Sequence, residues 1–185
     1  MIIKPMLGFN KVVPLEEVRM PCIASPKIDG IRLFNWLGNC FTRTMKPIGC
    51  RFVQSYISNS ILKGLDGECV VGEPNDPKIF KKTTGAVRTH SAEPDFDWWV
   101  FDERIGEKDL RGFWERYNTL KERFERGDFA QFTRVKLLEH VWINTHEELK
   151  QFEDKCAAEG WEGVMTRDPD GPYKMVAQPH LSSGC

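Results

Sequence analysis

Three charged residues crowd a short apolar stretch near the start of the chain, where SPKIDGIR carries Lys27, Asp29 and Arg32. A lysine amine can act as a nucleophile when its surroundings favour the uncharged form, although a solvated surface lysine is commoner. Asp29 opposes nucleophilicity, because a nearby carboxylate favours the ammonium form. Arg32 could grip a phosphate through two N–H groups, or it could pair with Asp29. The spacing therefore favours a site for a charged ligand.

Two acidic residues alternate along a second segment, LDGECVV. Period-two geometry directs Asp66 and Glu68 to one strand face, where a carboxylate pair among apolar residues needs a cation, a hydroxyl or a metal as partner. The alternative is a solvated outer face. Glu162 in WEGVMTR presents the same two alternatives. Phe101 in WWVFDE is either a stacking platform for a base or, more commonly, a core side chain.

Length and composition limit the classes of protein. The chain has 185 residues, 41% of them hydrophobic and 29% charged, which is typical of one globular domain. The net charge of -1 and the pI near 6.4 give no overall attraction to nucleic acid or to anionic membranes, so phosphate binding must be local. Basic residues concentrate in 27–51 and 78–88, whereas 93–109 is acidic.

The six cysteines form no CxxC pair and have no metal-ligand spacing with the four histidines, so we expect reduced thiols. The first residues lack a long apolar run followed by a small-residue cleavage site, and no run approaches the length that spans a bilayer. We therefore expect a cytoplasmic protein that does not engage a membrane.

Hydrophobic periodicity predicts strands and helices that interleave without a regular βαβ rhythm, which favours an α+β fold with antiparallel sheets. The expected strands are 22–28, 31–36, 40–44, 65–71, 96–103, 135–143 and 161–167. The expected helices are 51–62, 109–127 and 144–160. Asp29-Gly30 and Leu37-Gly38-Asn39 are hairpin signals between the first three strands.

Capping residues support two of the helices. Thr145 and Glu148 form a capping box, and Gly160 ends the same helix. Asp109 is a plausible cap for the helix in 109–127. The last eleven residues, 175–185, show no period and are expected to be a loose tail.

Five segments, taken in order, resemble the motifs of the adenylation domain of ATP-dependent DNA ligases, most closely the short ligases of phages. SPKIDGIR resembles K-x-D-G-x-R, and FTRTMKPIG resembles the S/T-R-T-x-K-P segment that follows it. LDGECVVG resembles the D-G-E strand, and FDWWVFDE the aromatic-F-D segment. EGWEGVMTRDPDGPYK resembles the E-G-V-M segment with its P-Y-K extension. The five matches cover residues 4 to 174, and K-x-D-G alone would be weak.

The resemblance implies an ATP-grasp-like nucleotidyltransferase domain over 1–174, in which two antiparallel sheets flanked by helices hold ATP in a cleft. Lys27 would attack the α-phosphate of ATP to form lysyl-AMP. The AMP would pass to the 5′-phosphate of a nick, and the 3′-hydroxyl would displace it and seal the strand. Arg32 and Arg43 would grip the nick phosphate and the AMP phosphate.

The remaining site residues follow from the same motifs. Glu68 would bond the ribose hydroxyls, and Phe101 would stack on adenine. Glu162, with Glu68, would hold a divalent metal, expected to be Mg²⁺. Asp29 and Lys46 lie in matching segments with less defined roles. The expected partner is nicked double-stranded DNA, the expected state is a monomer, and the processes served are DNA repair, replication and recombination.

Relatives continue after P-Y-K with a Gly-Arg-Ser-Thr-like stretch, a K-x-K strand and an oligonucleotide-binding (OB) barrel, which the residues after Lys174 do not match. We therefore expect a divergent tail at 175–185, from a truncated or frameshifted reading frame, and weak activity unless a separate OB-fold protein assists. The alternatives are an inactive nucleotide- or DNA-binding remnant and an RNA ligase or capping-type enzyme.

Overall fold

The computed structural model describes residues 2–4, 13–106, 109–174 and 176–178, with the side chains of 2–4 and 176–178 left aside. Its strands are β1 Ile2–Lys4, β2 Cys22–Pro26, β3 Ile31–Trp36, β4 Asn39–Thr42, β5 Leu65–Val70, β6 Asp97–Glu103, β7 Val135–Leu137, β8 Val141–Ile143, β9 Val164–Arg167 and β10 Val176–Gln178. Its α-helices are α1 Arg51–Ile57, α2 Ile79–Arg88, α3 Phe113–Glu125 and α4 His146–Ala158. Two 3₁₀ turns, η1 Leu15–Glu17 and η2 Ser60–Leu62, complete the described elements.

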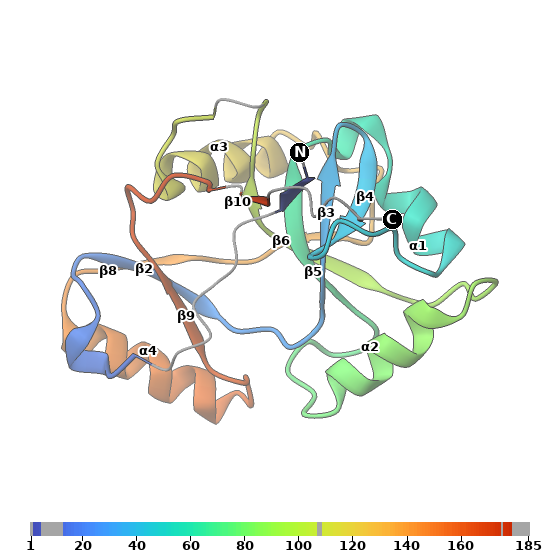
Figure 1. Cartoon of the computed structure of the whole chain (residues 1–185). Helices are drawn as coiled ribbons and strands as arrows, with labels where there is room; N and C mark the ends of the chain where they lie inside the picture. Colours follow the sequence, from blue (N-terminus) through green and yellow to red (C-terminus); the bar gives the residue numbers. More distant parts are fainter. Residues whose placement is uncertain (1, 5–12, 107–108, 175, 179–185) are drawn as a thin grey trace, which may run out of the picture.

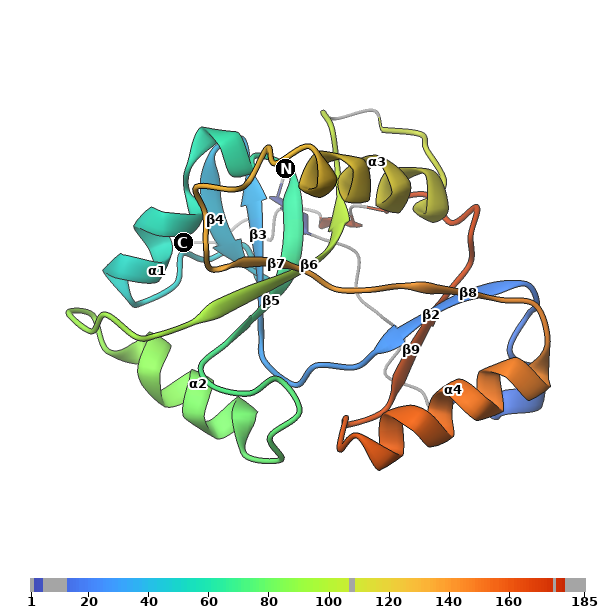
Figure 2. The same ribbon diagram turned by 180° about the vertical axis from the view of Figure 1, so that it is seen from behind.

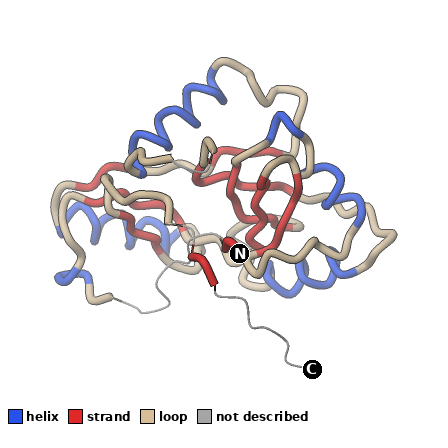
Figure 3. Tube along the Cα trace, turned by 45° about the horizontal axis from the view of Figure 1, so that its top comes forward, coloured by secondary structure: helices blue, strands red, loops and turns tan. Residues whose placement is uncertain are grey.

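The larger sheet has five strands in the order β4-β3-β5-β6-β7. β3 and β4 form a tight hairpin, and Leu37 and Gly38 at its turn have φ values of 53° and 84°, as a type I′ turn requires. All neighbours in this sheet are antiparallel except β6 and β7, which run parallel. Figure 3 shows the helices on the outside of the strands.

The second sheet has three strands in the order β8-β2-β9, all antiparallel, and α4 packs along it (Figure 2). α4 begins where predicted, because the Thr145 hydroxyl accepts the Glu148 N–H at 3.2 Å. The Glu148 carboxylate reaches back to the N–H of Asn144. Gly160 ends the helix with φ of 83°, a left-handed conformation that glycine adopts readily.

Each of the two sheets has its own hydrophobic core. The larger core joins the five-stranded sheet to α1 and α3, through residues such as Leu33, Val53, Trp98 and Leu120, which are fully buried. The smaller core joins β2 and β8 to α4 through Leu149, and Cys156 of α4 is also buried. The α+β prediction with two principal sheets is confirmed, apart from the parallel β6–β7 pair and the additional two-stranded sheet.

The prediction of a hairpin at Asp29-Gly30 is wrong, because β2 and β3 lie in different sheets. The segment between them crosses from one sheet to the other, as Figure 1 shows. Gly30 serves close packing there: a Cβ added to it would lie 2.4 Å from the Cys69 carbonyl oxygen of β5. Because Gly30 has no side chain, the loop can lie directly against β5 of the larger sheet.

The predicted strand 135–143 also divides between the sheets. Val135–Leu137 pairs with β6, and Val141–Ile143 pairs with β2. Three residues between them, 138–140, carry the chain across, and the apolar run conceals this change of partner. The two strands are therefore alike in their apolar sequence but belong to different sheets.

The other differences concern the helices. α2 was not predicted, because Gly85 and two threonines interrupt its apolar pattern. Gly112, not Asp109, lies at the start of α3; the Asp109 carboxylate instead accepts the N–H groups of Ile105 and Arg111. The helix expected over 51–62 ends at Ile57, and η2 follows it.

β1 and β10 form a separate antiparallel pair, with Ile2 opposite Gln178. Three residues of the expected tail are thus in a strand, and the others, 175 and 179–185, lie outside the described residues. No helix in the described ranges is long and apolar enough to cross a bilayer.

Candidate functional site

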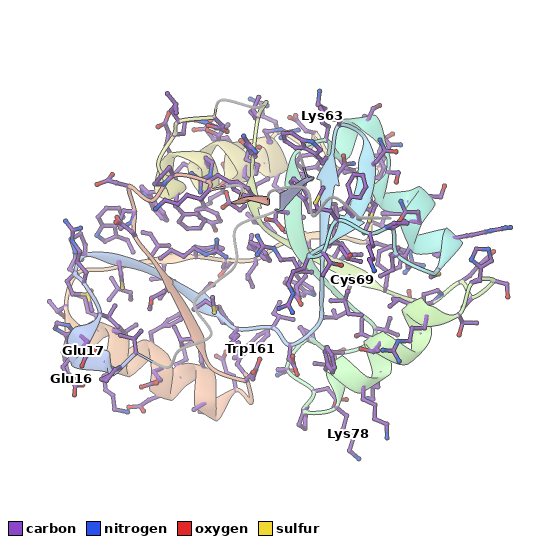
Figure 4. All side chains as sticks on the ribbon, viewed as in Figure 1. Glu16, Glu17, Lys63, Cys69, Lys78 and Trp161 are labelled. Atoms are coloured by element: carbon purple, nitrogen blue, oxygen red, sulfur yellow. The ribbon has the colours of Figure 1, made fainter. Side chains whose placement is uncertain are left out.

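Lys27 is placed by strand pairing between β2 and β9. It directly follows β2, and its N–H donates to the Gly163 carbonyl at 2.9 Å, continuing the ladder in which Pro26 faces Val164. This register sets the Lys27 amine beside the Glu162 carboxylate, and the two groups form an ion pair. Both side chains are about two-fifths exposed, at 44% and 41%. Figure 4 labels the neighbouring Trp161 between the α4 and α2 sides of the molecule.

Asp29 lies next to this ion pair on the loop that crosses to the larger sheet. Partial burial and the negative charge of Glu162 raise the pKa of Asp29, while the Lys27 ammonium opposes the shift. Two carboxylates and one amine therefore share a small region, and the negative charge exceeds the positive. Such a surplus favours binding of a cation.

Arg32 begins the second part of the site, in β3. Its Nε donates to Asp66 Oδ1 at 2.9 Å and its Nη2 to Asp66 Oδ2 at 2.5 Å, a two-point contact with a fully buried carboxylate. Burial acts to lower the pKa of Arg32, but Asp66 reverses that effect and raises it. The guanidinium is therefore charged at neutral pH. The sequence left open whether the Asp66–Glu68 pair has a partner or lies on a solvated outer face. The structure shows a cationic partner, Arg32.

Glu68 faces Arg32 across the β3–β5 ladder. Burial, followed by the charges of Asp66 and Asp29, raises its pKa to about 8, against the opposing effects of Arg32 and of a hydrogen bond from the Gly30 N–H. At neutral pH this carboxyl group therefore carries a proton most of the time. A protonated carboxyl can donate as well as accept a hydrogen bond.

Phe101 occupies an irregular position in β6. Asp66 pairs with Asp102 and Gly67 with Val100, so Phe101 is an extra residue, as in a β-bulge. The ring is 7% exposed, and two guanidinium groups lie over it: Arg32 at 5.3 Å and Arg167 at 4.9 Å from its centroid. The ring thus contacts both the site arginine and a residue of β9.

Arg43 and Lys46 lie in the turn that follows β4. The turn is closed by hydrogen bonds from the Thr42 N–H and hydroxyl to the Lys46 carbonyl, at 2.8 and 2.9 Å. Within the described ranges the two side chains make no ion pair or hydrogen bond, and both are exposed. Because Thr42 pairs with Leu33, the turn lies at the same end of the strands as Arg32.

The site therefore has two parts joined by the loop 27–30. Lys27, Asp29 and Glu162 meet beside the smaller sheet, while Arg32, Glu68 and Phe101 meet on the larger one. The charges of Asp29 and Glu68 influence each other across the loop. Arg43 and Lys46 lie at the margin and contact neither part.

The structure places three further residues here: Asp66, which the sequence singled out with Glu68 as a carboxylate pair, and Tyr173 and Arg167, which it gave no role. The Tyr173 hydroxyl donates to Asp66 at 2.6 Å, and Arg167 lies between the rings of Phe101 and Phe113. The spacing of Asp66 and Glu68 signalled the first. The other two lie in the segment that matches E-G-V-M and P-Y-K, but that pattern did not indicate their partners, which lie far away in the sequence.

Metal binding has a limited basis in this chain. Among the described residues, no three His, Cys, Asp or Glu side chains gather closely enough to hold an ion by themselves. Mg²⁺ commonly rests on one or two carboxylates together with water and substrate phosphates. Glu162 and Asp29 fit that pattern, since they are accessible oxygen donors with surplus negative charge. Glu68 fits less well while it holds its proton.

The comparison with protein families identifies the family of this chain. A family model described as the ATP-dependent DNA ligase domain matches residues 5–180, nearly the whole chain. The chain belongs to this family. The prediction drawn from the five motifs is thus confirmed for the family.

Solved structures show the same fold. The ligase-adenylate of Chlorella virus aligns with this ligase domain at a TM-score of 0.77 and 33% identity, covering 94% of this chain and 64% of that one. The bacteriophage T7 ligase in complex with ATP aligns at a TM-score of 0.60 and 16% identity, covering 89% and 61%. A Lig E DNA ligase aligns at 0.69 and 19%, covering 91% and 63%.

The ligase domain thus spans less than two thirds of the length of each of these three ligases. The nucleotidyltransferase fold predicted from the motifs is confirmed by the likeness to the Chlorella virus structure. No curated protein matches the chain.

Proposed function

We propose that this chain is an ATP-dependent DNA ligase adenylation domain that stores AMP on Lys27 and transfers it to the 5′-phosphate of nicked DNA. The observation that carries the proposal is the Lys27–Glu162 ion pair. It joins two motifs 135 residues apart in the sequence, at the junction with the loop that leads to Glu68 and Arg32. Family membership and the ATP-bound relative support the choice of nucleotide.

The proposed first step is attack by the Lys27 nitrogen on the α-phosphorus of ATP. A nitrogen–phosphorus bond forms, the bond to the bridging oxygen breaks, pyrophosphate leaves, and the amine loses a proton. The ion pair keeps the amine in place but must open, because an ammonium has no lone pair for attack. Glu162 is then available to accept that proton or to face a cation.

In the second and third steps the stored AMP moves on. An oxygen of the 5′-phosphate attacks the AMP phosphorus and the nitrogen–phosphorus bond breaks, which restores the amine. The 3′-hydroxyl then attacks the activated 5′-phosphorus, forms the phosphodiester and releases AMP. Arg32 and Arg43 are proposed to bind these phosphates, since guanidinium groups match phosphate oxygens in pairs.

The larger sheet offers groups suited to a nucleoside. Trp99 faces Glu68 across the β5–β6 ladder, and its buried Nε1 has no hydrogen-bond partner among the described residues. An unpartnered donor beside a partly protonated carboxyl fits a ligand rich in hydroxyl and phosphate oxygens. We propose that Glu68 bonds the ribose and that Phe101 contacts adenine, with Asp29 and Lys46 nearby.

A divalent cation, proposed to be Mg²⁺, would be held by Glu162 and would screen the charge of the phosphates. The proposed setting is a monomer in the cytoplasm that serves DNA repair, replication or recombination. Free thiols agree with that setting, since the five described cysteines form no disulfide. A separate OB-fold protein is a proposed helper.

The test is to incubate the protein with α-labelled ATP and Mg²⁺ and to look for AMP bound in an acid-labile, base-stable linkage. Lys27→Ala should abolish the label. Lys150→Ala is a matched control, because Lys150 is also exposed and paired with a carboxylate, that of Asp154 at 2.5 Å, but lies in α4. The control should label like the wild type.

The labelled protein is then offered nicked DNA, nicked RNA and triphosphate-ended RNA in parallel. Transfer of the label to the 5′-phosphate of nicked DNA alone supports the proposal. Transfer to RNA would identify an RNA ligase or a capping-type enzyme instead. No label on the wild type under any condition would overturn the proposal in favour of an inactive nucleotide- or DNA-binding protein, and binding of ATP would then be measured directly.

A further inference from the structure

We infer that Tyr173 is a positioning residue for Arg32, acting through the Asp66 carboxylate; the inference rests on the proposed function for its kinetic meaning. The Tyr173 hydroxyl donates to Asp66 Oδ2 at 2.6 Å. The same oxygen accepts Arg32 Nη2, and Asp66 Oδ1 accepts Arg32 Nε. One carboxylate thus holds the tyrosine and the arginine together.

The hydroxyl determines how the carboxylate is turned. Asp66 is fully buried and Tyr173 is 5% exposed, so water cannot replace the hydroxyl without rearrangement. A carboxylate can rotate about its last side-chain bond, and its plane sets the plane of a guanidinium bound at two points. A third donor fixes that rotation. Loss of the Tyr173 oxygen would leave the Arg32–Asp66 contact but free its orientation.

The Tyr173 ring is held firmly enough to act in this way. Its centroid lies 6.4 Å from that of Phe34, and the Arg104 and Arg116 guanidinium carbons lie 5.8 and 5.6 Å from it. The backbone just before the ring is also fixed, because Arg116 donates to the Gly171 carbonyl at 3.1 Å.

The segment that carries Tyr173 begins at the end of β9. It packs against the start of α3, where the Trp114 N–H donates to the Pro169 carbonyl at 2.9 Å and a Cβ on Gly112 would lie 2.9 Å from the same oxygen. The smaller sheet, which carries Lys27 and Glu162, is thus linked through 168–173 to the arginine of the larger sheet. Tyr173 therefore aligns the two parts of the site.

Tyr173→Phe removes only the oxygen and keeps the ring. In the preadenylated protein it should slow AMP transfer to the 5′-phosphate of nicked DNA about five- to twentyfold, as expected for a lost hydrogen bond to a charged group. Tyr117→Phe is the matched control. Tyr117 is 3% exposed and its hydroxyl accepts the His140 N–H at 3.1 Å, away from Asp66. The control should change transfer less than about twofold.

A double-mutant cycle separates positioning from general stability. If Tyr173 acts through Arg32, Tyr173→Phe should have little further effect on transfer in an Arg32→Lys background. Replacing Tyr173 by 4-aminophenylalanine, which keeps a donor, should restore most of the rate. Equal slowing by the two tyrosine variants, or additive effects in the cycle, would overturn the inference.

A second readout does not depend on activity. In protein with ¹⁵N-labelled arginine, the Nε–H resonance of Arg32 should exchange slowly with solvent, and Tyr173→Phe should shift it and speed its exchange while Tyr117→Phe leaves it unchanged. An unchanged resonance in Tyr173→Phe would refute the positioning role. If the wild type forms no lysyl-AMP, the proposed function fails while this measurement still decides the role of Tyr173.

Discussion

Two buried aspartates, Asp66 in β5 and Asp102 in β6, face each other across the larger sheet, and each is bound at two points by an arginine. Arg32 binds Asp66 at 2.9 and 2.5 Å, and Arg116 binds Asp102 at 2.8 and 3.0 Å. The pairs have the same chemistry and almost the same geometry, but they differ in what else the arginine meets.

Arg116 is fully buried, and it also donates hydrogen bonds to the backbone carbonyls of Arg111 and Gly171, at 2.6 and 3.1 Å. It joins α3, β6 and the segment after β9 into one unit. Arg32 has a side chain that is 16% exposed and lies beside Glu68 and Phe101. Arg116, which is bound to backbone carbonyls inside the core, has a structural role. Arg32 lies at the margin of the core, where a ligand can contact it.

The largest expected effect on stability is that of Arg116→Leu. It leaves the Asp102 carboxylate buried, with Arg167 at 3.7 Å as the remaining cationic partner among the described residues. Loss of one partner of a buried ion pair costs about 3–5 kcal/mol of unfolding free energy. Urea denaturation followed by tryptophan fluorescence measures it. A loss below about 1 kcal/mol would mean that the two pairs do not differ as described.

Asp66→Asn should have a smaller effect on stability, about 1.5–3 kcal/mol, because Arg32 can reach water when its contact weakens. Asp66→Asn should slow AMP transfer more than an equally destabilising substitution of Asp102 or Arg116 does, because Arg32 loses its orientation. The same denaturation series, combined with single-turnover transfer assays, checks both parts. Equal transfer rates in variants of the two pairs would contradict the distinction.

Glu68→Gln tests the proton held beside the Arg32 pair. The pKa of Glu68 is raised from about 4.5 to about 8, so the folded state binds this proton more tightly than the unfolded state, and stability should fall as pH rises through that interval. The slope is at most about 1.4 kcal/mol per pH unit. The variant should lack this slope.

The comparison is best made between about pH 6.5 and 8. Burial, with a contribution from Arg167, lowers the pKa of His140 to about 3, so stability linked to His140 is lost only as pH falls from about 6.5 towards 3. Denaturation midpoints of the wild type and Glu68→Gln at the two ends of the interval give the result. Parallel curves would show that Glu68 is already ionised.

Glu162→Gln should change stability least, by less than about 1 kcal/mol, because its ion pair with Lys27 is exposed. Labelling by ATP should nevertheless fall at least about tenfold, since the carboxylate faces the Lys27 amine that is proposed to react. Thermal denaturation and the labelling assay measure the two quantities. A stability loss as large as that of Asp66→Asn would place Glu162 among the structural pairs instead.

Local patterns predicted much of the fold, including its α+β class, and the family motifs predicted the nucleotidyltransferase fold. Thr145 and Gly160 define α4, and Leu37-Gly38 define the β3–β4 hairpin, because caps and tight turns depend on residues within a few positions. Which sheet a strand joins is not a local property. The strands before and after 27–30 belong to different sheets, and so do those before and after 138–140. The pattern of apolar residues in a strand does not indicate which of the two sheets it joins.

The candidate site shows the same division. Lys27, Arg32, Glu68 and Glu162 were found from residue type and motif, and the structure places Lys27 against Glu162 and Arg32 opposite Glu68. Tyr173 was overlooked because its contact with Asp66 joins positions 107 residues apart. A tyrosine in a turn has no local mark of burial, so only the folded chain reveals its partner.

The contacts of Arg167 connect the two larger sheets. Its guanidinium comes from β9 and lies 4.9 Å from the centre of the Phe101 ring and 4.7 Å from that of Phe113. Arg167 also lies 3.7 Å from the Asp102 carboxylate. Pulling β9 away from the larger sheet would therefore break two ring contacts and an ion pair at once. This one side chain thus holds the strand beside Glu162 to the strand that carries Asp102.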